Sequence, residues 1–319
     1  MTSVSAIERE LDRLRDDQLG DGHGVRTSIS NLVIFGASRD LADEAADAVM
    51  SMGSNRPSRA IVAHPAADAT GVEAEISVYC TRPPDGHGSY VCADLVELRG
   101  PIDGQALRQM VTSLLLPDLP VFLVWEAPPD FDRPTFGDLA AESDRLVTNA
   151  SRHRGTFEAL PALTKRHTPL LTDFAWTTVT GWRDALAGLF DLPEHAACLA
   201  ALESIDIRHA AGSDVQARLV AGWVESRTRR DARCSFEEDA ELPYPAGSLL
   251  RVTIVADGET FQVERLDADT VIATSPRLPE QRRGLPVPTY PDLLAGELEF
   301  LARDDIFTDA LGAATDLWR

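Results

Sequence analysis

The feature of this sequence that most constrains its fold is an alternation of short apolar runs and amphipathic segments in the first half of the chain. Residues 31–35 form an apolar run, and Leu41, Ala45 and Val49 follow at the spacing of one helix face. A second apolar run occupies residues 59–63. A strand, a helix and a strand joined by short connections predict a right-handed crossover between two parallel strands.

Residues 72–80 show a different period, because apolar and more polar side chains alternate there. This period of two predicts a strand buried on one face, and turn residues at 83–86 connect it to another strand at 90–98. A predicted helix over 103–114 precedes an apolar run at 121–125 that is typical of an interior strand. Together these elements predict an N-terminal α/β domain with a mixed or parallel sheet and flanking helices.

The second half of the chain has the pattern of an antiparallel meander. A strand is predicted over 204–209, and residues 250–273 alternate in the manner of three strands, with a tight Asp-Gly hairpin turn at 257–258. A helix over 213–223 and two closing helices within 290–317 accompany these strands. We therefore predict a C-terminal α+β domain.

The length of 319 residues accommodates two domains with separate cores. We predict an N-terminal helix and linker over residues 1–27, an N-terminal domain over 28–170 and a C-terminal domain over 171–319. The first helix is either a free arm or docks on this protein or on a partner. Residues 227–245, which are charged and broken by proline, are expected to form a surface excursion.

Composition limits the classes of partner. The net charge of −21 and the pI near 4.6 argue against nucleic-acid binding, which depends on neutralising phosphates with cations, and favour partners with basic patches. There is no apolar run of about 18 residues, and the N-terminal segment is charged. We therefore expect neither a membrane span nor a signal peptide, and we expect the protein in the cytoplasm. The sequence leaves homo-oligomerisation open.

Residues for catalysis or metal binding are scarce or badly spaced. Lys165 is the only lysine, and no GxxxxGK loop, GxSxG elbow or HExxH helix occurs. Only His195 and Cys198 approach the spacing of a metal pair, without a second pair to complete a zinc site. The cysteines show no CxxC spacing and are expected to be reduced and buried; they are Cys80, Cys92, Cys198 and Cys234. We predict no metal, no cofactor and no enzyme activity.

Two alternative functions remain open from the residues. The turn at 36–42 follows a strand and opens a helix, as in nicotinamide-dependent oxidoreductases, but Arg39 stands where a glycine should let the backbone approach a pyrophosphate. The other alternative is a sugar-phosphate-sensing module, since guanidinium groups suit phosphate. Its residues would be Arg154, Lys165 and Arg166, which otherwise belong to a solvated linker.

Tryptophans supply the remaining candidate residues. Trp176 and Trp182 stand six residues apart near the middle of the chain, and a helix is predicted to begin with Thr180 as its N-cap. Trp125 ends the interior strand, at the edge where open α/β sheets bind ligands. Because such rings bury a large apolar body, these residues are either core or, together with Arg183, anchors in an interface rich in Trp and Arg.

Several short motifs carry a resemblance to a known family. They are DFAWT at 173–177, TGWR at 180–183, PSRAIV at 57–62, PDLPV at 117–121 with Trp125 after it, the pair Asp144 and Arg145, and LVAGW at 219–223. In their order along the chain, the motifs resemble those of the glucose-6-phosphate dehydrogenase assembly protein (OpcA) family.

The resemblance implies a non-enzymatic protein of the oxidative pentose phosphate pathway. Such a protein binds glucose-6-phosphate dehydrogenase as an assembly factor or allosteric activator and promotes its active oligomer. The residues expected in or beneath the contact surface are Trp125, Trp176, Trp182 and Arg183. Some family members are redox-regulated through a cysteine pair, but this chain has no close pair near its C-terminus, so such control is not expected.

Overall fold

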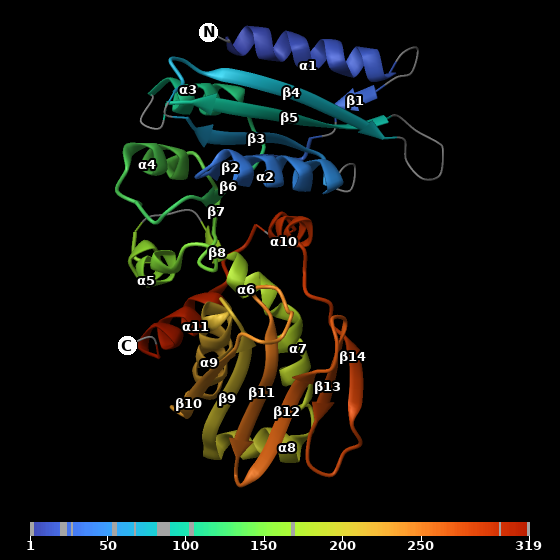
Figure 1. Cartoon of the computed structure of the whole chain (residues 1–319), viewed down its shortest axis with the longest axis vertical. Helices are drawn as coiled ribbons and strands as arrows, with labels where there is room; N and C mark the ends of the chain where they lie inside the picture. Colours follow the sequence, from blue (N-terminus) through green and yellow to red (C-terminus); the bar gives the residue numbers. More distant parts are fainter. Residues whose placement is uncertain are drawn as a thin grey trace. The chain divides into compact units, whose positions relative to one another are not determined.

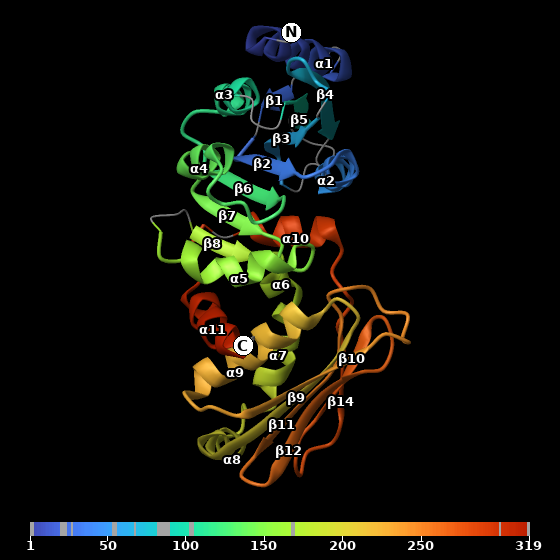
Figure 2. The same ribbon diagram turned by 60° about the vertical axis from the view of Figure 1, so that its left-hand side comes forward.

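The structure is a computed structural model (Figures 1 and 2). It describes residues 3–19, 24–26, 28–52, 56–66, 68–81, 90–101, 105–166, 170–299 and 301–317. The chain forms two compact units. Unit 1 comprises Met1–Thr148, His167–Leu171 and Tyr290–Ala302, and unit 2 comprises Asn149–Arg166, Thr172–Thr289 and Arg303–Arg319.

The core of unit 1 is a sheet built on β2 (Ser30–Gly36). Its neighbours β3 (Ser58–Pro65) and β6 (Val121–Glu126) both run parallel to it, which confirms the predicted crossover. β2 is buried along its whole length, which explains the apolar side chains of residues 32–35. The other strands are β1 (Gly24–Arg26), β4 (Glu73–Thr81), β5 (Tyr90–Gly100), β7 (Arg145–Thr148) and β8 (Leu170–Asp173).

The strand order is β1-β5-β3-β2-β6-β7-β8, with β4 paired to β5 outside this path. β4 and β5 form the predicted antiparallel hairpin, in register from Glu73 opposite Arg99 to Thr81 opposite Val91. The predicted turn at 83–86 lies outside the described residues. The order of the strands reverses between β2 and β6, because β3 lies on one side of β2 and β6 on the other.

Helices cover both faces of this sheet. They are α1 (Val4–Leu19), α2 (Arg39–Met52), α3 (Gln105–Leu114), α4 (Pro134–Ala141) and α10 (Tyr290–Glu297). In Figure 2, α2 and α10 lie to the right of the sheet and α3 and α4 to its left. The guanidinium group of Arg145 donates to Glu297 Oε2 at 2.7 Å, and both side chains are buried, so a late segment of the chain completes unit 1.

Cys80 on β4 and Cys92 on β5 are cross-strand partners and form a disulfide. The expectation of reduced cysteines is wrong for this pair, because their meeting depends on hairpin register, which no local motif encodes. Cys198 and Cys234 are free. Burial raises the pKa of the Cys234 thiol to about 12, which keeps it protonated and unreactive.

A six-stranded sheet forms the core of unit 2, in the order β10-β9-β11-β12-β13-β14. Its strands are β9 (Leu202–Ala210), β10 (Arg233–Asp239), β11 (Leu249–Ala256), β12 (Glu259–Arg265), β13 (Thr270–Thr274) and β14 (Gln281–Gly284). The predicted meander is confirmed, and its turn places Asp257 and Gly258 at positive φ, as a tight hairpin requires. β10 pairs in parallel with β9, so residues 227–245 are not merely a surface excursion.

The helices of unit 2 are α5 (Arg154–Leu163), α6 (Phe174–Thr178), α7 (Thr180–Gly188), α8 (Pro193–Cys198), α9 (Asp214–Thr228) and α11 (Asp305–Asp316), with a short 3₁₀ helix at Leu199–Ala201. α9 packs closely on α11, because a Cβ at Gly222 would lie 2.5 Å from the carbonyl oxygen of Ala310. α5 occupies half of the predicted linker at 151–170, so that segment is partly helical.

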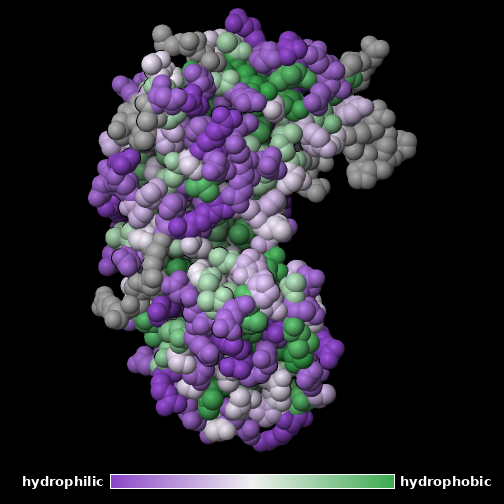
Figure 3. All heavy atoms as spheres, viewed as in Figure 1, coloured by the Kyte–Doolittle hydropathy of each residue, from purple (hydrophilic) through white to green (hydrophobic). Residues whose placement is uncertain are grey.

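The surface is mostly hydrophilic on the face drawn in Figure 3. Within the described ranges, the large hydrophobic side chains that are exposed are Ile29, Tyr79, Leu242, Leu266, Leu278, Leu301 and Ile306. They are far apart in sequence, and single exposed apolar residues are normal for a globular protein. No helix in the described part of the chain is long and apolar enough to cross a bilayer.

Candidate functional site

Unit 1 has a pocket of about 230 Å³ where the strand order reverses between β2 and β6. Open α/β sheets bind ligands in this crevice, beyond the carboxyl ends of their strands. The lining includes Phe35, Pro65, Trp125, Pro128, Asp130 and Arg133. The prediction that Trp125 lies at this edge of the sheet is therefore confirmed. We call this pocket the aromatic pocket, and it is the candidate site of unit 1.

Trp125 forms part of the pocket wall but is itself almost completely buried, with 3% of its surface exposed. Its ring stacks on Phe35 at 4.6 Å between centroids and meets the edge of Phe136 at 5.0 Å. Its indole N–H donates to the carbonyl oxygen of Pro128 at 3.3 Å. The ring is thus satisfied within the protein, and a role in partner contact would come from the pocket that it shapes.

Two backbone amides of the glycine turn after β2 have acceptors within the protein. The N–H of Ala37 donates to the carbonyl oxygen of Glu126 at 3.0 Å, and the N–H of Leu41 donates to Ser38 Oγ at 3.4 Å. Dinucleotide-binding turns instead direct such amides at a pyrophosphate. A pyrophosphate here would have to replace these contacts, which weighs against the nicotinamide alternative.

The tryptophan-rich segment begins with a capped helix. Asp173 Oδ1 accepts from the N–H of Ala175 at 2.8 Å, and Asp173 Oδ2 accepts from the N–H of Ala150 at 2.9 Å. The prediction of an N-cap at Thr180 is wrong, because α7 already includes Thr180 and is preceded by Val179, which provides no side-chain cap. The chain is therefore helical from Phe174, one short helix earlier than predicted.

Trp176 joins α6 to α11. It is 3% exposed, and its indole N–H donates to Asp304 Oδ2 at 2.7 Å. Asp304 also caps α11, because its other carboxylate oxygen accepts from the N–H of Phe307 at 2.8 Å. The sequence placed Asp304 at a helix start, but its pairing with Trp176 has no sequence signal, since the two residues are distant in the chain.

Arg183 stacks on Trp176, with its guanidinium carbon 3.4 Å from the ring centroid. Its Nη2 donates to Thr180 Oγ at 2.8 Å, whereas its buried Nε has no acceptor within the described residues. Burial lowers the pKa of Arg183 to about 10. Arg183 is thus a partly desolvated cation with unused donor capacity.

Trp182 is 3% exposed and belongs to the core of unit 2. The guanidinium group of Arg265 lies over its ring at 5.6 Å. The preceding Gly181 packs closely on Leu285, whose side chain would have to shift to admit a Cβ there. The TGWR motif therefore fixes α7 against the chain around Leu285, and partner contact by Trp182 stays a prediction.

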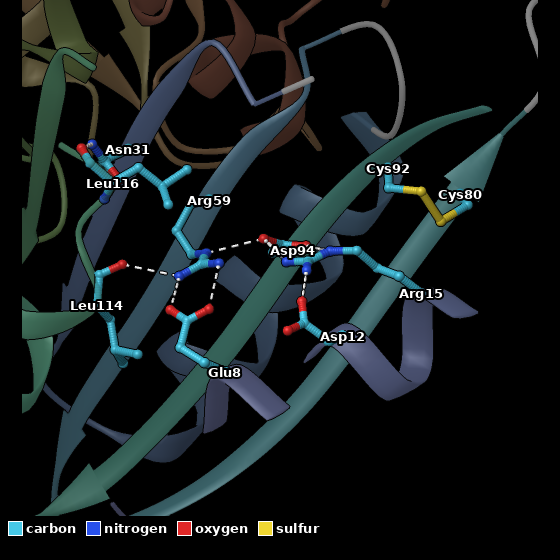
Figure 4. Close-up of polar contacts among 10 residues, drawn as sticks. All are labelled: Glu8, Asp12, Arg15, Asn31, Arg59, Cys80, Cys92, Asp94, Leu114 and Leu116. Atoms are coloured by element: carbon cyan, nitrogen blue, oxygen red, sulfur yellow. Dashed lines mark hydrogen bonds and ion pairs between the residues drawn. A yellow bond between two sulfur atoms is a disulfide. The ribbon is translucent and has the colours of Figure 1, made fainter. Parts of the chain in front are cut away.

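Arg59, from the PSRAIV motif, lies at the centre of a buried ion network (Figure 4). Its Nε donates to Asp94 Oδ2 at 3.0 Å and its Nη1 to Glu8 Oε1 at 2.6 Å. Arg15 donates to both oxygens of Asp94, at 3.1 and 2.7 Å. Together with the buried Ile7, these contacts dock α1 on unit 1, so the N-terminal helix is not a free arm.

The remaining candidates form no recognisable centre. Arg154 begins α5, and Lys165 and Arg166 follow the end of that helix. Within the residues that the structure describes, no group of three or more His, Cys, Asp or Glu side chains is arranged to hold a metal ion. The aromatic pocket and the Trp176–Arg183 stack are therefore the candidate sites that geometry supports best.

The fold defines the class of protein first: a two-unit α/β chain with a Rossmann-like sheet in one unit. It is similar to an oxidoreductase from Sinorhizobium meliloti, with a TM-score of 0.53 over 91% of this chain and 96% of that one. The sequence identity is 8%, so the likeness concerns the fold alone.

The sequence then gives the family. Residues 33–165 match the glucose-6-phosphate dehydrogenase subunit N-terminal domain of OpcA, and residues 169–311 match the corresponding C-terminal domain. The chain belongs to the OpcA family, as its motifs predicted.

Cyanobacterial relatives described as "Putative OxPP cycle protein OpcA" are similar over part of the chain. The Synechocystis protein is 28% identical over 181 residues, which is 56% of this chain and 38% of the relative. The Nostoc punctiforme protein is 29% identical over 161 residues, which is 49% of this chain and 34% of the relative. The matched region thus spans little more than a third of these relatives.

Proposed function

We propose that this chain is a non-catalytic partner of glucose-6-phosphate dehydrogenase in the oxidative pentose phosphate pathway, which binds the enzyme and promotes its active oligomer. The observation that carries the proposal is the family match across both parts of the chain, residues 33–165 and 169–311. A protein of this kind acts by binding one conformation or oligomer of the enzyme more tightly than another.

The geometry of the candidate sites supports this proposal over catalysis. Two amides of the β2–α2 turn are bonded within the protein, and the charged groups of the aromatic pocket, Asp130 and Arg133, pair with each other. The contact surface would be supported from within the protein by Trp125, Trp176 and Trp182. Arg183 would supply a polar anchor, because stacked guanidinium groups with unused donors are frequent at interface centres.

The test is to mix the purified chain with the dehydrogenase of the same organism. We expect light scattering to show a complex heavier than either protein and the substrate saturation curve of the enzyme to change. Arg183→Gln should weaken the complex, whereas Arg277→Gln, which changes an arginine with 79% of its side chain exposed, should not. Separate masses and unchanged kinetics at several salt concentrations would refute the proposal.

The nicotinamide alternative has its own test. Ligands that bind only the folded state raise the melting temperature, and the increase grows with the logarithm of the ligand concentration above Kd. We expect NAD and NADP to leave the melting temperature unchanged, because Arg39 stands where a glycine would let the backbone approach a pyrophosphate. An increase in the melting temperature with NAD or NADP that Ala37→Pro abolishes would instead favour an oxidoreductase.

A further inference from the structure

A second pocket of unit 1, of about 240 Å³, lies at the carboxyl ends of β3 and β5. It differs from the aromatic pocket in being lined mainly by charged side chains. Its walls come from β3, β4, β5 and the first turns of α2, and the residues used below are Asp43, His64, Glu73, Glu75, Glu97 and Arg99. We call it the acidic pocket.

Two carboxylates in the acidic pocket oppose each other directly. Glu75 on β4 and Glu97 on β5 are cross-strand partners in the hairpin register. Like charges at such positions destabilise a sheet, and neither residue forms an ion pair within the described residues. Burial raises the pKa of Glu97, and the nearby Glu75 and Asp43 raise it further. Glu97 is half-buried and Glu75 is exposed, and the pair carries negative charge that no ion pair within the described residues balances.

The arginines at the rim pair with carboxylates other than Glu75 and Glu97. Arg99 donates to both oxygens of Asp68, at 2.6 and 2.7 Å, and to Glu73 at 3.0 Å. Arg39 pairs loosely with Asp43 at 3.5 Å and is mostly exposed. The pocket keeps more carboxylates than guanidinium groups, so its interior attracts cations.

His64 is an independent sign of a ligand. Its side chain lines the acidic pocket from the end of β3, it is only 9% exposed, and its buried Nδ1 has no hydrogen bond of good geometry within the described residues, although the backbone of Pro65 lies near enough to act on the pKa of the ring. Burial lowers the pKa of His64, which favours the neutral imidazole. A neutral imidazole nitrogen accepts a hydrogen bond, and a buried polar atom without one is costly.

We propose that the acidic pocket binds an arginine side chain of the partner dehydrogenase. A guanidinium group is planar, carries several donors and pairs with two carboxylates at once, as Glu75 and Glu97 would allow. It would balance the opposed charges and supply the donor that His64 lacks. The inference rests on the proposed function for the identity of the partner, whereas cation binding by the pocket does not depend on it.

The isolated chain tests the pocket by itself. The probe is L-argininamide, titrated by calorimetry or NMR, with the neutral isostere L-citrullinamide as a control ligand. We expect saturable argininamide binding, no citrullinamide binding, and loss of binding in the Glu75→Gln/Glu97→Gln double variant. The control variant Asp16→Asn/Glu142→Gln removes as many exposed carboxylates and should bind normally. Absence of argininamide binding to the wild-type chain would overturn the proposal.

The dehydrogenase complex tests the partner. We expect the double variant to bind the enzyme about tenfold more weakly at low salt, which corresponds to about 1.4 kcal/mol, and the difference to shrink as salt screens the charges. Equal affinities for the double and control variants would overturn the partner assignment even if argininamide binds. Absence of a wild-type complex would refute the proposed function and this assignment, while argininamide binding would still show a cation pocket.

A stability measurement separates binding from structural roles. Because the Glu75–Glu97 pair is repulsive in the free chain, its removal should raise the melting temperature or leave it unchanged. A fall of several degrees would mean that the carboxylates support the fold, and it would contradict the proposal.

Discussion

Asp94 and Glu97 stand three positions apart on β5, yet their surroundings are opposite. Successive side chains of a strand point to opposite faces, so Asp94 faces α1 and Glu97 faces the side of α2. Asp94 is 1% exposed and accepts from two arginines, whereas Glu97 opposes another carboxylate and has no ion-pair partner in the described part of the chain. A carboxylate whose charge is balanced internally serves the fold, and one left unbalanced is available for binding.

The three candidate tryptophans resemble Asp94, because their side chains have their partners within the protein. Trp125, Trp176 and Trp182 have apolar neighbours or internal partners for their rings, and each is 3% exposed. The most conspicuous residues of the sequence are therefore internally satisfied, while the ordinary-looking Glu75 and Glu97 are not. The comparison predicts that changes in the first group reduce stability and that changes in the second group reduce binding.

The largest effect is expected for Trp182→Ala. Removing a buried indole leaves a cavity, and the free energy of unfolding should fall by about 3–5 kcal/mol, as measured by urea denaturation. The fraction that remains folded should still bind the dehydrogenase, and Trp182→Phe should lose less stability. If stability survives while binding disappears, Trp182 is an interface anchor and the comparison fails for the aromatic group.

A loss of similar size is expected for Asp94→Asn. The change leaves the buried guanidinium groups of Arg15 and Arg59 without their shared carboxylate, and breaking a buried ion pair from one side costs about 3–5 kcal/mol. Hydrogen exchange should also show that α1 opens more often, because Arg15 is one of its anchors. Asp16→Asn, on the exposed side of α1, is the matched control and should change stability by less than about 0.5 kcal/mol.

The smallest predicted change in the free energy of unfolding is an increase rather than a decrease. Glu97→Gln removes one member of the repulsive pair and should stabilise the chain by about 0.5 kcal/mol at neutral pH. The pKa of Glu97 is raised in the folded state, so the wild-type protein loses stability as pH rises above the unfolded-state pKa. The advantage of the variant should therefore vanish in acid, where Glu97 is protonated in both states. An advantage independent of pH would mean that charge is not its cause.

Much of the fold was predictable because buried positions recur in the sequence with the period of the helix or strand that they belong to. The apolar runs at 31–35 and 59–63 are buried on both faces, and the meander after residue 249 alternates as a half-buried sheet should. β10 was missed because it is an edge strand with mostly polar, accessible side chains. β10 is held in the sheet by its pairing with β9, and no pattern within residues 227–245 indicates that pairing.

The candidate sites were less predictable, because they depend on pairs that meet only in the folded chain. The sequence singled out Trp176 but not Asp304, and it named Cys80 and Cys92 without indicating that they pair. The Glu75–Glu97 pair was invisible among 51 acidic residues until the hairpin register placed the two side chains opposite each other. Local motifs identify which residues are unusual, whereas register decides which residues interact.

The salt bridge between Arg145 and Glu297 has a consequence for biosynthesis. Glu297 emerges from the ribosome long after the strands of unit 1, and until then the guanidinium group of Arg145 has no carboxylate from α10 to neutralise it. Unit 1 is therefore complete only after residues 290–297 have been translated. For the same reason, an expression plasmid that stops before codon 290 would yield a first unit that lacks one of its own helices.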